Sequence, residues 1–311
     1  MTETVLPALS LDLQNKDAAG FAERLGASFR EYGFAVIADH GVPADLIAQA
    51  EEDMRVFFAL PEDVKRAYHV PGAAGARGFT PFGTEIAKDA KAHDLKEFWH
   101  IGRALPADHQ HAEIMPPNIW PKEVARFEQT FAALFDALDK AGIRILDGIS
   151  DYLDIGRDLL RDGVTDGNSV LRLLHYPPIS VDAPGVRAGA HEDINTITLL
   201  LGAEEAGLEL KDRSGRWLPV APPPGALVVN IGDMLSRLTN DVLPSTSHRV
   251  VNPPPERRGN ARYSMPFFLH FRPDFLIETL PSCLDGRENR YPEPITAQNF
   301  LEQRLREIGL A

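Results

Sequence analysis

The strongest constraint on the fold is a change of pattern near the middle of the chain. From Val170 onward, short runs rich in β-branched and aromatic residues alternate with turn residues: LRLLHY, TITLLL, GLELKD, RWLPV, ALVVNIG, HRVV and RYSMPFFLHF. Short strands at this spacing are typical of an antiparallel sandwich or barrel. We therefore expect a mainly β core.

The first half of the chain has a different, mainly helical pattern. Apolar residues recur at helical spacing over residues 21–32, 46–57 and 122–153. The short apolar stretch 33–42 indicates a strand, and the glycine-rich stretch 71–91 indicates a long loop that could form an active-site wall. We expect these helices to flank the β core, with the longest one supporting the sheet.

The length of 311 residues is compatible with one globular unit built from three parts. We assign residues 1–165 to an N-terminal helical and strand region, 166–295 to the β core, and 296–311 to a C-terminal helix. Apolar residues at helical spacing predict this last helix: Phe300, Leu301, Leu305 and Ile308. These apolar residues form one face of the helix, and this face needs a surface to pack against. The helix is therefore expected to be either a lid over a functional cavity or a cap on the core.

Charge and cysteine content narrow the functional classes. The 32 basic and 45 acidic side chains give a net charge of −13, without the basic patch that binding a phosphate backbone needs. We expect a small-molecule partner and neither nucleic acid nor a membrane. The lone Cys283 excludes an internal disulfide and cysteine-rich metal sites. No secretory leader pattern is present at the N-terminus, so we expect a cytoplasmic protein.

The segment GAHEDINTITLLL carries the candidate chemistry. In an extended chain His191 and Asp193 project to the same side, and His248 begins a later strand-like run. Two imidazoles and one carboxylate on one face of an iron ion leave open positions for a co-substrate and dioxygen. Catalytic zinc also uses three protein ligands. Because the chain has ten histidines, ordinary core or surface histidines are the competing interpretation.

A second pair of polar residues supports a binding site. Arg262 and Ser264 follow His248 and alternate along one strand-like run, RYSMPFF. A guanidinium and a hydroxyl on one face can bind a carboxylate with charge-assisted hydrogen bonds.

Taken together, these motifs resemble the isopenicillin N synthase-like family of iron(II) and 2-oxoglutarate-dependent dioxygenases. The family pattern of His-x-Asp, distal His and Arg-x-Ser is matched by His191, Asp193, His248, Arg262 and Ser264. The N-terminal segments EYGFAVIADHGVP and FFALPEDVK are also similar to the family. LLHYPP is similar to the segment whose tyrosine reaches the 2-oxoglutarate carboxylate, which implies that role for Tyr176.

The resemblance implies a double-stranded β-helix, or jelly roll, as the core. It also implies Fe(II), 2-oxoglutarate and O2 as cofactor and co-substrates, with oxidation of a small molecule by hydroxylation, desaturation or cyclisation and release of succinate and CO2. Two alternatives are an iron enzyme of the same fold that does not use 2-oxoglutarate, and a non-enzymatic jelly-roll binding or sensing protein. Neither the substrate nor the oligomeric state follows from the sequence.

The sequence departs from the family pattern in two places. Arg262 lies a few residues further from His248 than expected, so Arg257 and Arg258 compete for its role. We favour Arg262 because the other two lie in a turn-like segment rich in proline and glycine. Leu174 and His175 stand where many relatives have Asn and Tyr, so some co-substrate contacts should differ.

Other residues are weaker candidates. In the family that the chain resembles, RGFTPFGTE and DLKEFWHIG border the substrate cavity, although aromatic residues there could equally pack the core. Phe267 or Phe268 could flank the iron pocket, and by strand alternation one of the pair should point to the core. The substrate candidates are Arg77, Phe79, Phe82, Lys96, Trp99, His100 and Phe268. Asn230 either supports the metal ligands or simply ends a strand. We expect His40 and His270, both in apolar runs, to be buried with their hydrogen bonds satisfied.

Overall fold

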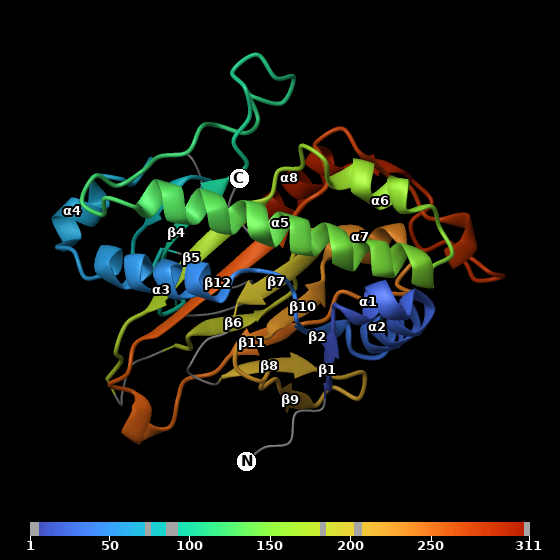
Figure 1. The fold of residues 1–311 in the computed structure, drawn as a ribbon, viewed down its shortest axis with the longest axis horizontal. Helices are drawn as coiled ribbons and strands as arrows, with labels where there is room; N and C mark the ends of the chain where they lie inside the picture. Colours follow the sequence, from blue (N-terminus) through green and yellow to red (C-terminus); the bar gives the residue numbers. More distant parts are fainter. Residues whose placement is uncertain (1–5, 72–75, 85–92, 181–184, 202–206, 308–311) are drawn as a thin grey trace.

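The computed structural model describes residues 6–71, 76–84, 93–180, 185–201 and 207–307, and its centre is a sandwich of two β-sheets (Figure 1). The larger sheet has the strand order β1 (Ala8–Ser10), β2 (Phe34–Ala38), β10 (Leu227–Ile231), β7 (Ile197–Leu201), β12 (Arg262–Leu269), β5 (Val170–Tyr176), β4 (Glu97–Gly102), β3 (Gly78–Thr80). The smaller sheet has the order β6 (Ala188–His191), β11 (His248–Val250), β8 (Leu208–Lys211), β9 (Trp217–Pro219). This is the antiparallel sandwich that the strand pattern predicts and the jelly-roll core that the family resemblance implies.

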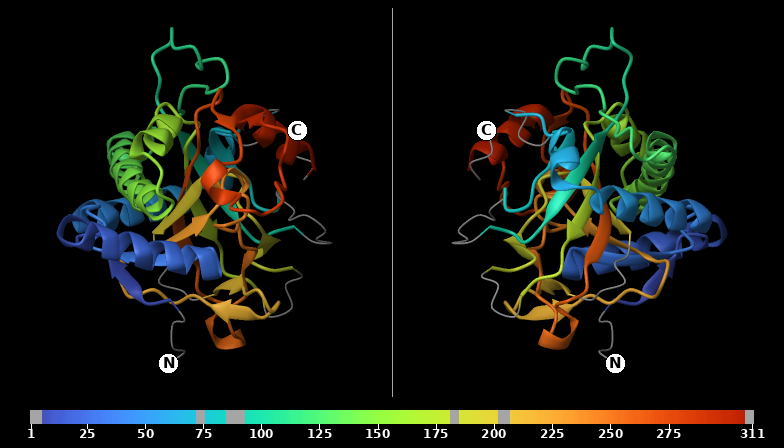
Figure 2. Two further views of the ribbon diagram at one scale, coloured as in Figure 1. Left: turned by 90° about the vertical axis from the view of Figure 1, so that its right-hand side faces the viewer. Right: turned by 90° about the vertical axis from the view of Figure 1, so that its left-hand side faces the viewer.

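Helices cover the outer face of the larger sheet. The long helix α5 (Phe127–Tyr152) contacts β7 and β12, and α2 (Ala18–Tyr32) and α3 (Ala44–Phe58) pack on α5 (Figures 1 and 2). The remaining helical segments are short: α1 (Leu13–Lys16), α4 (Glu62–Arg66), α6 (Arg157–Val164), α7 (Asp233–Leu238), α8 (Ala297–Glu307), and the 3-10 turns η1 (Pro255–Arg257) and η2 (Pro281–Cys283). A small ladder of β13 (Leu276–Ile277) and β14 (Ile295–Thr296) precedes α8.

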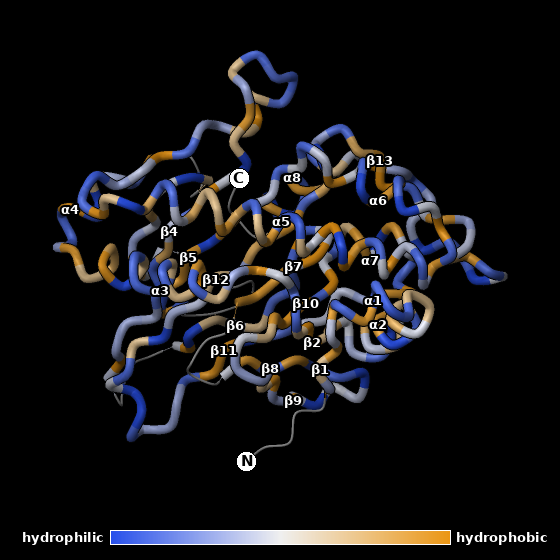
Figure 3. Tube along the Cα trace, viewed as in Figure 1, coloured by the Kyte–Doolittle hydropathy of each residue, from blue (hydrophilic) through white to orange (hydrophobic). Residues whose placement is uncertain are grey.

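The two faces of the larger sheet bury different sets of side chains. On β4, Trp99 joins the large apolar core under the helices, whereas its neighbour Phe98 faces the inside of the sandwich. The same alternation separates Phe267 from Ser264 on β12. Figure 3 shows that the strands of the sandwich carry both hydrophobic and hydrophilic residues. The outer face therefore supplies most of the apolar core, and the inner face is available for polar chemistry.

The structure confirms the predicted helices and strands of both halves, with two corrections. The first half was expected to be mainly helical with one strand at 33–42, which is β2, but it also provides β1 beside β2 at one edge of the larger sheet and β4 and β3 at the other edge. The predicted loop 71–91 contains strand β3, and its residues 72–75 and 85–91 lie outside the described part of the chain. Residues 1–165 and 166–295 thus share one sheet.

The predicted C-terminal helix is present as α8. Ala297 and Phe300 are buried, and Leu301 packs against the same core, whereas Ile308 lies outside the described residues. Among the helices of the described ranges, none has the length and apolar character needed to span a bilayer.

The contact between α2 and α5 yields a stability prediction. A Cβ atom on Gly148 would lie 2.6 Å from Cε1 of Phe21 and 2.9 Å from Cδ2 of Leu25, and both of these side chains are fully buried. Overpacking of this kind costs about 1–3 kcal/mol, and because both contacts are under 3.0 Å we expect a cost above the gain of about 1 kcal/mol in helix propensity. Gly148→Ala should therefore lower the midpoint of urea unfolding, and adding Phe21→Leu should restore part of it. A more stable Gly148→Ala protein would contradict this account of the packing.

Candidate metal centre

Three potential ligands converge at one end of the smaller sheet. His191 ends β6, His248 begins β11, and the two are cross-strand partners, while Asp193 lies in the turn after β6. Nε2 of His191 lies 3.8 Å from Oδ1 of Asp193, and Nε2 of His248 lies 3.9 Å from Oδ2. One ligand atom from each residue falls within 4.8 Å of the others. The arrangement can accommodate a single metal ion.

Backbone carbonyl groups fix the orientation of both imidazoles. Nδ1 of His191 donates to the carbonyl of Gly189 at 2.8 Å, and Nδ1 of His248 donates to the carbonyl of Thr246 at 3.1 Å. A carbonyl can only accept, so in each ring the proton lies on Nδ1 and Nε2 keeps its lone pair. Both lone pairs therefore belong to the atoms that face Asp193, as metal ligation requires.

The carboxylate of Asp193 is held by neighbours on the larger sheet. Its Oδ2 accepts hydrogen bonds from Nδ2 of Asn230 at 2.8 Å and from Oγ1 of Thr198 at 2.5 Å. Burial alone would raise the pKa of Asp193, but the two histidines and these donors outweigh it and lower the pKa. The carboxylate thus stays ionised, and Asn230 is one of its two anchors.

The surroundings also keep His191 neutral. Desolvation by the surrounding protein and the charge of His248 lower the pKa of His191 to about 4, although its side chain is 39% exposed. Asp193 opposes this shift, and Lys96 adds to it. Lys96 is buried and donates from Nζ to Asp94 at 2.8 Å, while the other carboxylate oxygen of Asp94 accepts from the backbone of Gly189.

The residues predicted to bind the co-substrate lie together on the inner face. Arg262 on β12 is opposite Tyr176 on β5, and its guanidinium carbon lies 5.0 Å from the centre of the tyrosine ring. Nη1 of Arg262 donates to Oγ of Ser264 at 3.0 Å. Arg262 is 3% exposed, whereas Arg257 is exposed in η1 and Arg258 follows it. Of the three arginines, Arg262 alone occupies this strand.

The substrate candidates lie in different environments. Phe79 and Trp99 lie in the apolar core under the helices, where both rings pack near Phe57, so they are core residues and do not line the inner face. Arg77 is buried and hydrogen-bonded to the carbonyls of Ala76 and Pro116, and Phe82 is 44% exposed. Phe268 is the candidate whose strand position on β12 places it on the inner face, and Lys96 is a buried residue directly before β4.

Two further residues on the inner face, Thr198 and Arg172, were not predicted from the sequence. His100, from the segment DLKEFWHIG that was expected to border the substrate cavity, is the cross-strand partner of Arg172. Strand alternation offered a signal for Arg172, because it precedes Tyr176 by four positions on the same strand. Thr198 could be recognised only after its cross-strand neighbours were known.

The two apolar-run histidines differ in their hydrogen bonding. His40 is buried. Its Nε2 donates a hydrogen bond to the carbonyl of Gly225, and its Nδ1 accepts one from the backbone N–H of Val42, so the prediction of a buried, satisfied histidine is confirmed. His270 is buried too, but its Nδ1 has no hydrogen-bond partner within the described ranges, so the expectation that its bonds are satisfied was wrong for this part of the chain. Burial lowers the pKa of His270 to about 4, and the charge of Asp193 opposes the shift.

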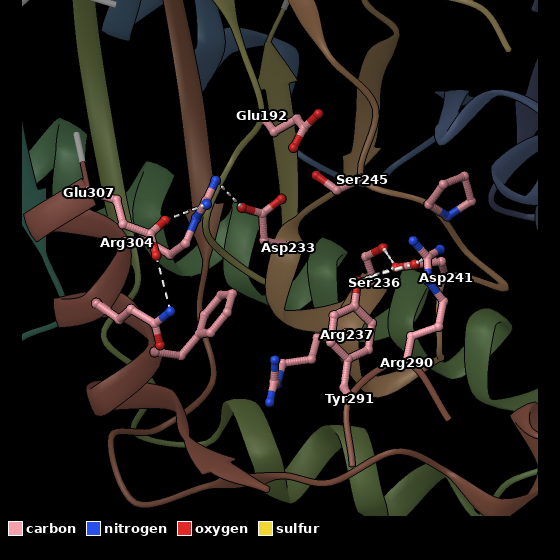
Figure 4. Close-up of a pocket in the computed structure, with 13 residues that line it drawn as sticks. Glu192, Asp233, Ser236, Arg237, Asp241, Ser245, Arg290, Tyr291, Arg304 and Glu307 are labelled. Atoms are coloured by element: carbon pink, nitrogen blue, oxygen red, sulfur yellow. Dashed lines mark hydrogen bonds and ion pairs between the residues drawn. The ribbon is translucent and has the colours of Figure 1, made fainter. Parts of the chain in front are cut away.

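A polar cavity of about 430 Å³ adjoins the turn that carries Asp193 (Figure 4). Glu192, Ser245 and the helix α8 contribute to its walls. Asp233 donates its backbone N–H to the carbonyl of Asp193 at 2.7 Å, and its carboxylate pairs with Arg304 of α8 at 3.1 Å. Burial raises the pKa of Asp233 despite this pairing. The C-terminal helix is thereby tied to the ligand turn.

Comparison with known families gives matches in both halves of the chain. The profile described as "non-haem dioxygenase in morphine synthesis N-terminal" matches residues 6–123, and that of the "2OG-Fe(II) oxygenase superfamily" matches residues 167–271. A 2-oxoglutarate-Fe(II) type oxidoreductase, hxnY, of Emericella nidulans is 34% identical over 91% of this chain and 83% of its own. The proline hydroxylase buaE of Petromyces alliaceus is 32% identical over 92% of each chain.

Solved structures agree with these matches. A Caulobacter crescentus protein assigned to the 2OG-Fe(II) oxygenase family superposes with a TM-score of 0.92 and 56% identity over 98% of this chain and 100% of its own. A Neurospora crassa protein solved in complex with alpha-KG and thymine superposes with a TM-score of 0.85 and 28% identity over 97% of each chain.

The shifted pKa of His270 predicts a pH-dependent stability. The unfolded chain takes up this proton below a pH of about 6.5 and the folded chain only near pH 4, so the stabilisation is present above pH 6.5 and is lost as the pH falls to about 4. This difference between the two pKa values corresponds to about 3 kcal/mol of unfolding free energy. In metal-free protein, the unfolding free energy of wild type minus that of His270→Gln should rise by up to this amount from pH 4 to pH 6.5. A difference that stays constant with pH would contradict it.

Proposed function

Because the chain belongs to the 2-oxoglutarate and iron(II)-dependent oxygenases of the isopenicillin N synthase-like family, we propose that His191, Asp193 and His248 hold its iron and that Arg262, Ser264 and Tyr176 bind its co-substrate. The protein is an oxidoreductase that couples oxidation of a small-molecule substrate by dioxygen to conversion of 2-oxoglutarate into succinate and CO2.

The convergence of the three ligands is the observation that carries the metal assignment. Two Nε2 lone pairs and one ionised carboxylate lie within 4.8 Å of one another, a donor set suited to iron(II) with coordination positions left open. When bound there, iron supplies the activation of dioxygen and of the 2-oxo acid. The role of the chain is to hold the imidazoles in the correct tautomer and the carboxylate in place.

Arg262 supports the co-substrate assignment. It is a buried cation on the inner face, with Ser264 and Tyr176 beside it, and a guanidinium can bind a carboxylate through two parallel hydrogen bonds. The distal carboxylate of 2-oxoglutarate would lie against this group, while its 2-oxo acid end faces the metal ligands. The inner face would then exclude water from the reacting atoms.

The substrate is expected to be a small, polar, cyclic molecule. One relative is named a proline hydroxylase, and one structural neighbour is described in complex with thymine, which supports this size and polarity. We infer that the protein acts on free molecules in the cytoplasm. Its net charge of −13 disfavours nucleic acid and anionic membranes as partners.

The anchors of Asp193 give the first test of the metal site. Thr198→Val keeps the shape of the side chain but removes one donor to the carboxylate, so it should weaken iron(II) binding about 10–100-fold. Asp193→Ala should abolish tight binding. Thr239→Val is the matched control, because this buried threonine bonds the carbonyl of Leu235 in helix α7. Equal iron affinity of the Thr198 and Thr239 variants would contradict the support role.

The co-substrate site is tested by comparing two arginines. Arg262→Ala should raise the dissociation constant for 2-oxoglutarate about 30-fold or more, since removing one partner of a buried charge pair costs about 2–5 kcal/mol. Arg258→Ala should change it little. The measurement is an anaerobic titration of the iron(II)–2-oxoglutarate absorption band, and a large loss in Arg258→Ala would move the role to that residue.

A further inference from the structure

We propose that Arg172 is the residue that recognises the primary substrate, and that this substrate is a flat ring whose edge carries oxygen acceptors. The proposal rests on the proposed function, because it assumes that iron and 2-oxoglutarate occupy the assigned positions. Arg172 would bind the oxygen-bearing edge, and the rings of Phe98 and Phe268 would flank it.

Strand register places Arg172 on the same face as the co-substrate residues. Arg172, Leu174 and Tyr176 alternate along β5, so all three point to one side of the sheet. Leu174 is opposite Ser264 on β12, and Tyr176 is opposite Arg262. Arg172, two positions before Leu174, therefore also points to the inner face of the sheet. It lies near the first residue of β5, whereas Tyr176 is the last.

Two phenylalanine rings and a histidine position the guanidinium. Its central carbon lies 4.2 Å from the ring centre of Phe98 and 5.3 Å from that of Phe268. Nε of Arg172 donates to Nε2 of His100 at 2.5 Å. Arginine can only donate, so His100 accepts with Nε2 and is neutral, and the positive charge belongs to Arg172. The guanidinium is thus an oriented cation with aromatic neighbours.

The same contacts connect Arg172 to the metal centre. Phe268 is the cross-strand partner of Thr198, whose hydroxyl donates to Asp193. Side chains of directly opposed residues in an antiparallel pair lie about 5 Å apart at Cβ. A ring lying on Phe268 with its acceptor edge at Arg172 would therefore direct its far side towards the metal ligands, which is where the C–H bond to be oxidised must lie.

The chemistry of a flanked guanidinium defines the substrate class. Its planar array of N–H donors matches two oxygen acceptors in one plane, and aromatic neighbours favour a flat partner. An aromatic carboxylate and a ring with carbonyl groups both present this edge. A cation of the same shape does not, and it would be repelled by Arg172.

Anaerobic binding to the iron(II)–2-oxoglutarate form of the full chain tests the proposal. The probes are 4-methylbenzoate, thymine and the shape-matched cation 4-methylbenzylamine, and the readout is the change in the visible absorption band. At least one oxygen-bearing probe should perturb the band, and the amine should not. Which of the two binds distinguishes carboxylate from ring carbonyl.

The variants separate recognition from folding. Arg172→Gln should raise the dissociation constant of the bound probe at least about tenfold, because the charged donors are lost, while the dissociation constant for 2-oxoglutarate stays within about twofold. Arg172→Lys keeps the charge but loses the planar fork, so its effect should be intermediate. Arg249→Gln is the matched control, since Arg249 also stacks on an aromatic ring, Trp217, but lies in the smaller sheet and pairs with Glu209.

The outcomes that overturn the proposal are distinct from failure of the proposed function. If wild-type protein forms the 2-oxoglutarate band but neither oxygen-bearing probe perturbs it, the substrate class is wrong. If a probe binds to the Arg172→Gln and Arg172→Lys variants as tightly as to the wild-type protein, Arg172 is not the recognition residue. The same conclusion follows if the amine binds more tightly than both oxygen-bearing probes. If the band does not form at all, the assignment of the iron and co-substrate site fails first.

Discussion

The rest of the site depends on keeping the carboxylate of Asp193 ionised although it is almost fully buried. Asp193 is 7% exposed, and burying a charge is unfavourable unless hydrogen bonds or opposite charges compensate. The compensation comes from separate parts of the fold: Asn230 on β10, Thr198 on β7, and the two histidines of the smaller sheet. The strands that carry ligands or anchors must therefore be in register before the charge is stabilised.

The need to keep these strands in register explains why the two faces of the larger sheet carry different kinds of side chains. The outer face packs against α2, α3 and α5 in a continuous apolar core, which includes Phe131 and Leu138. The inner face carries a smaller apolar cluster and the polar residues of the site, among them Arg262 and Ser264. Apolar packing on one side supplies the rigidity that the polar side needs to keep its geometry.

The sequence predicts those parts of the fold and site that depend on local pattern. The helices at 21–32 and 46–57 follow from apolar spacing, and the choice of Arg262 agrees with its strand position, because Arg257 and Arg258 occupy a turn. Phe79 and Trp99 were mistaken for cavity residues, since the face that a strand residue occupies depends on register with its neighbours. Thr198 was missed for the same reason, because its role comes from contacts with residues far away in the sequence. Arg172 could have been recognised from its alternation with Tyr176 on one strand.

The strand order of the larger sheet has a consequence for how the protein is made. β2 pairs with β10, and β4 pairs with β5, so strands of the first half acquire these partners only after residues far downstream have been synthesised. Pairings between distant segments form slowly, and an unpaired strand edge invites association with other chains. A nascent chain stalled before residue 227 would thus expose β2 without its partner β10. Efficient production should depend on chaperones that protect these strands until the ribosome releases the completed chain.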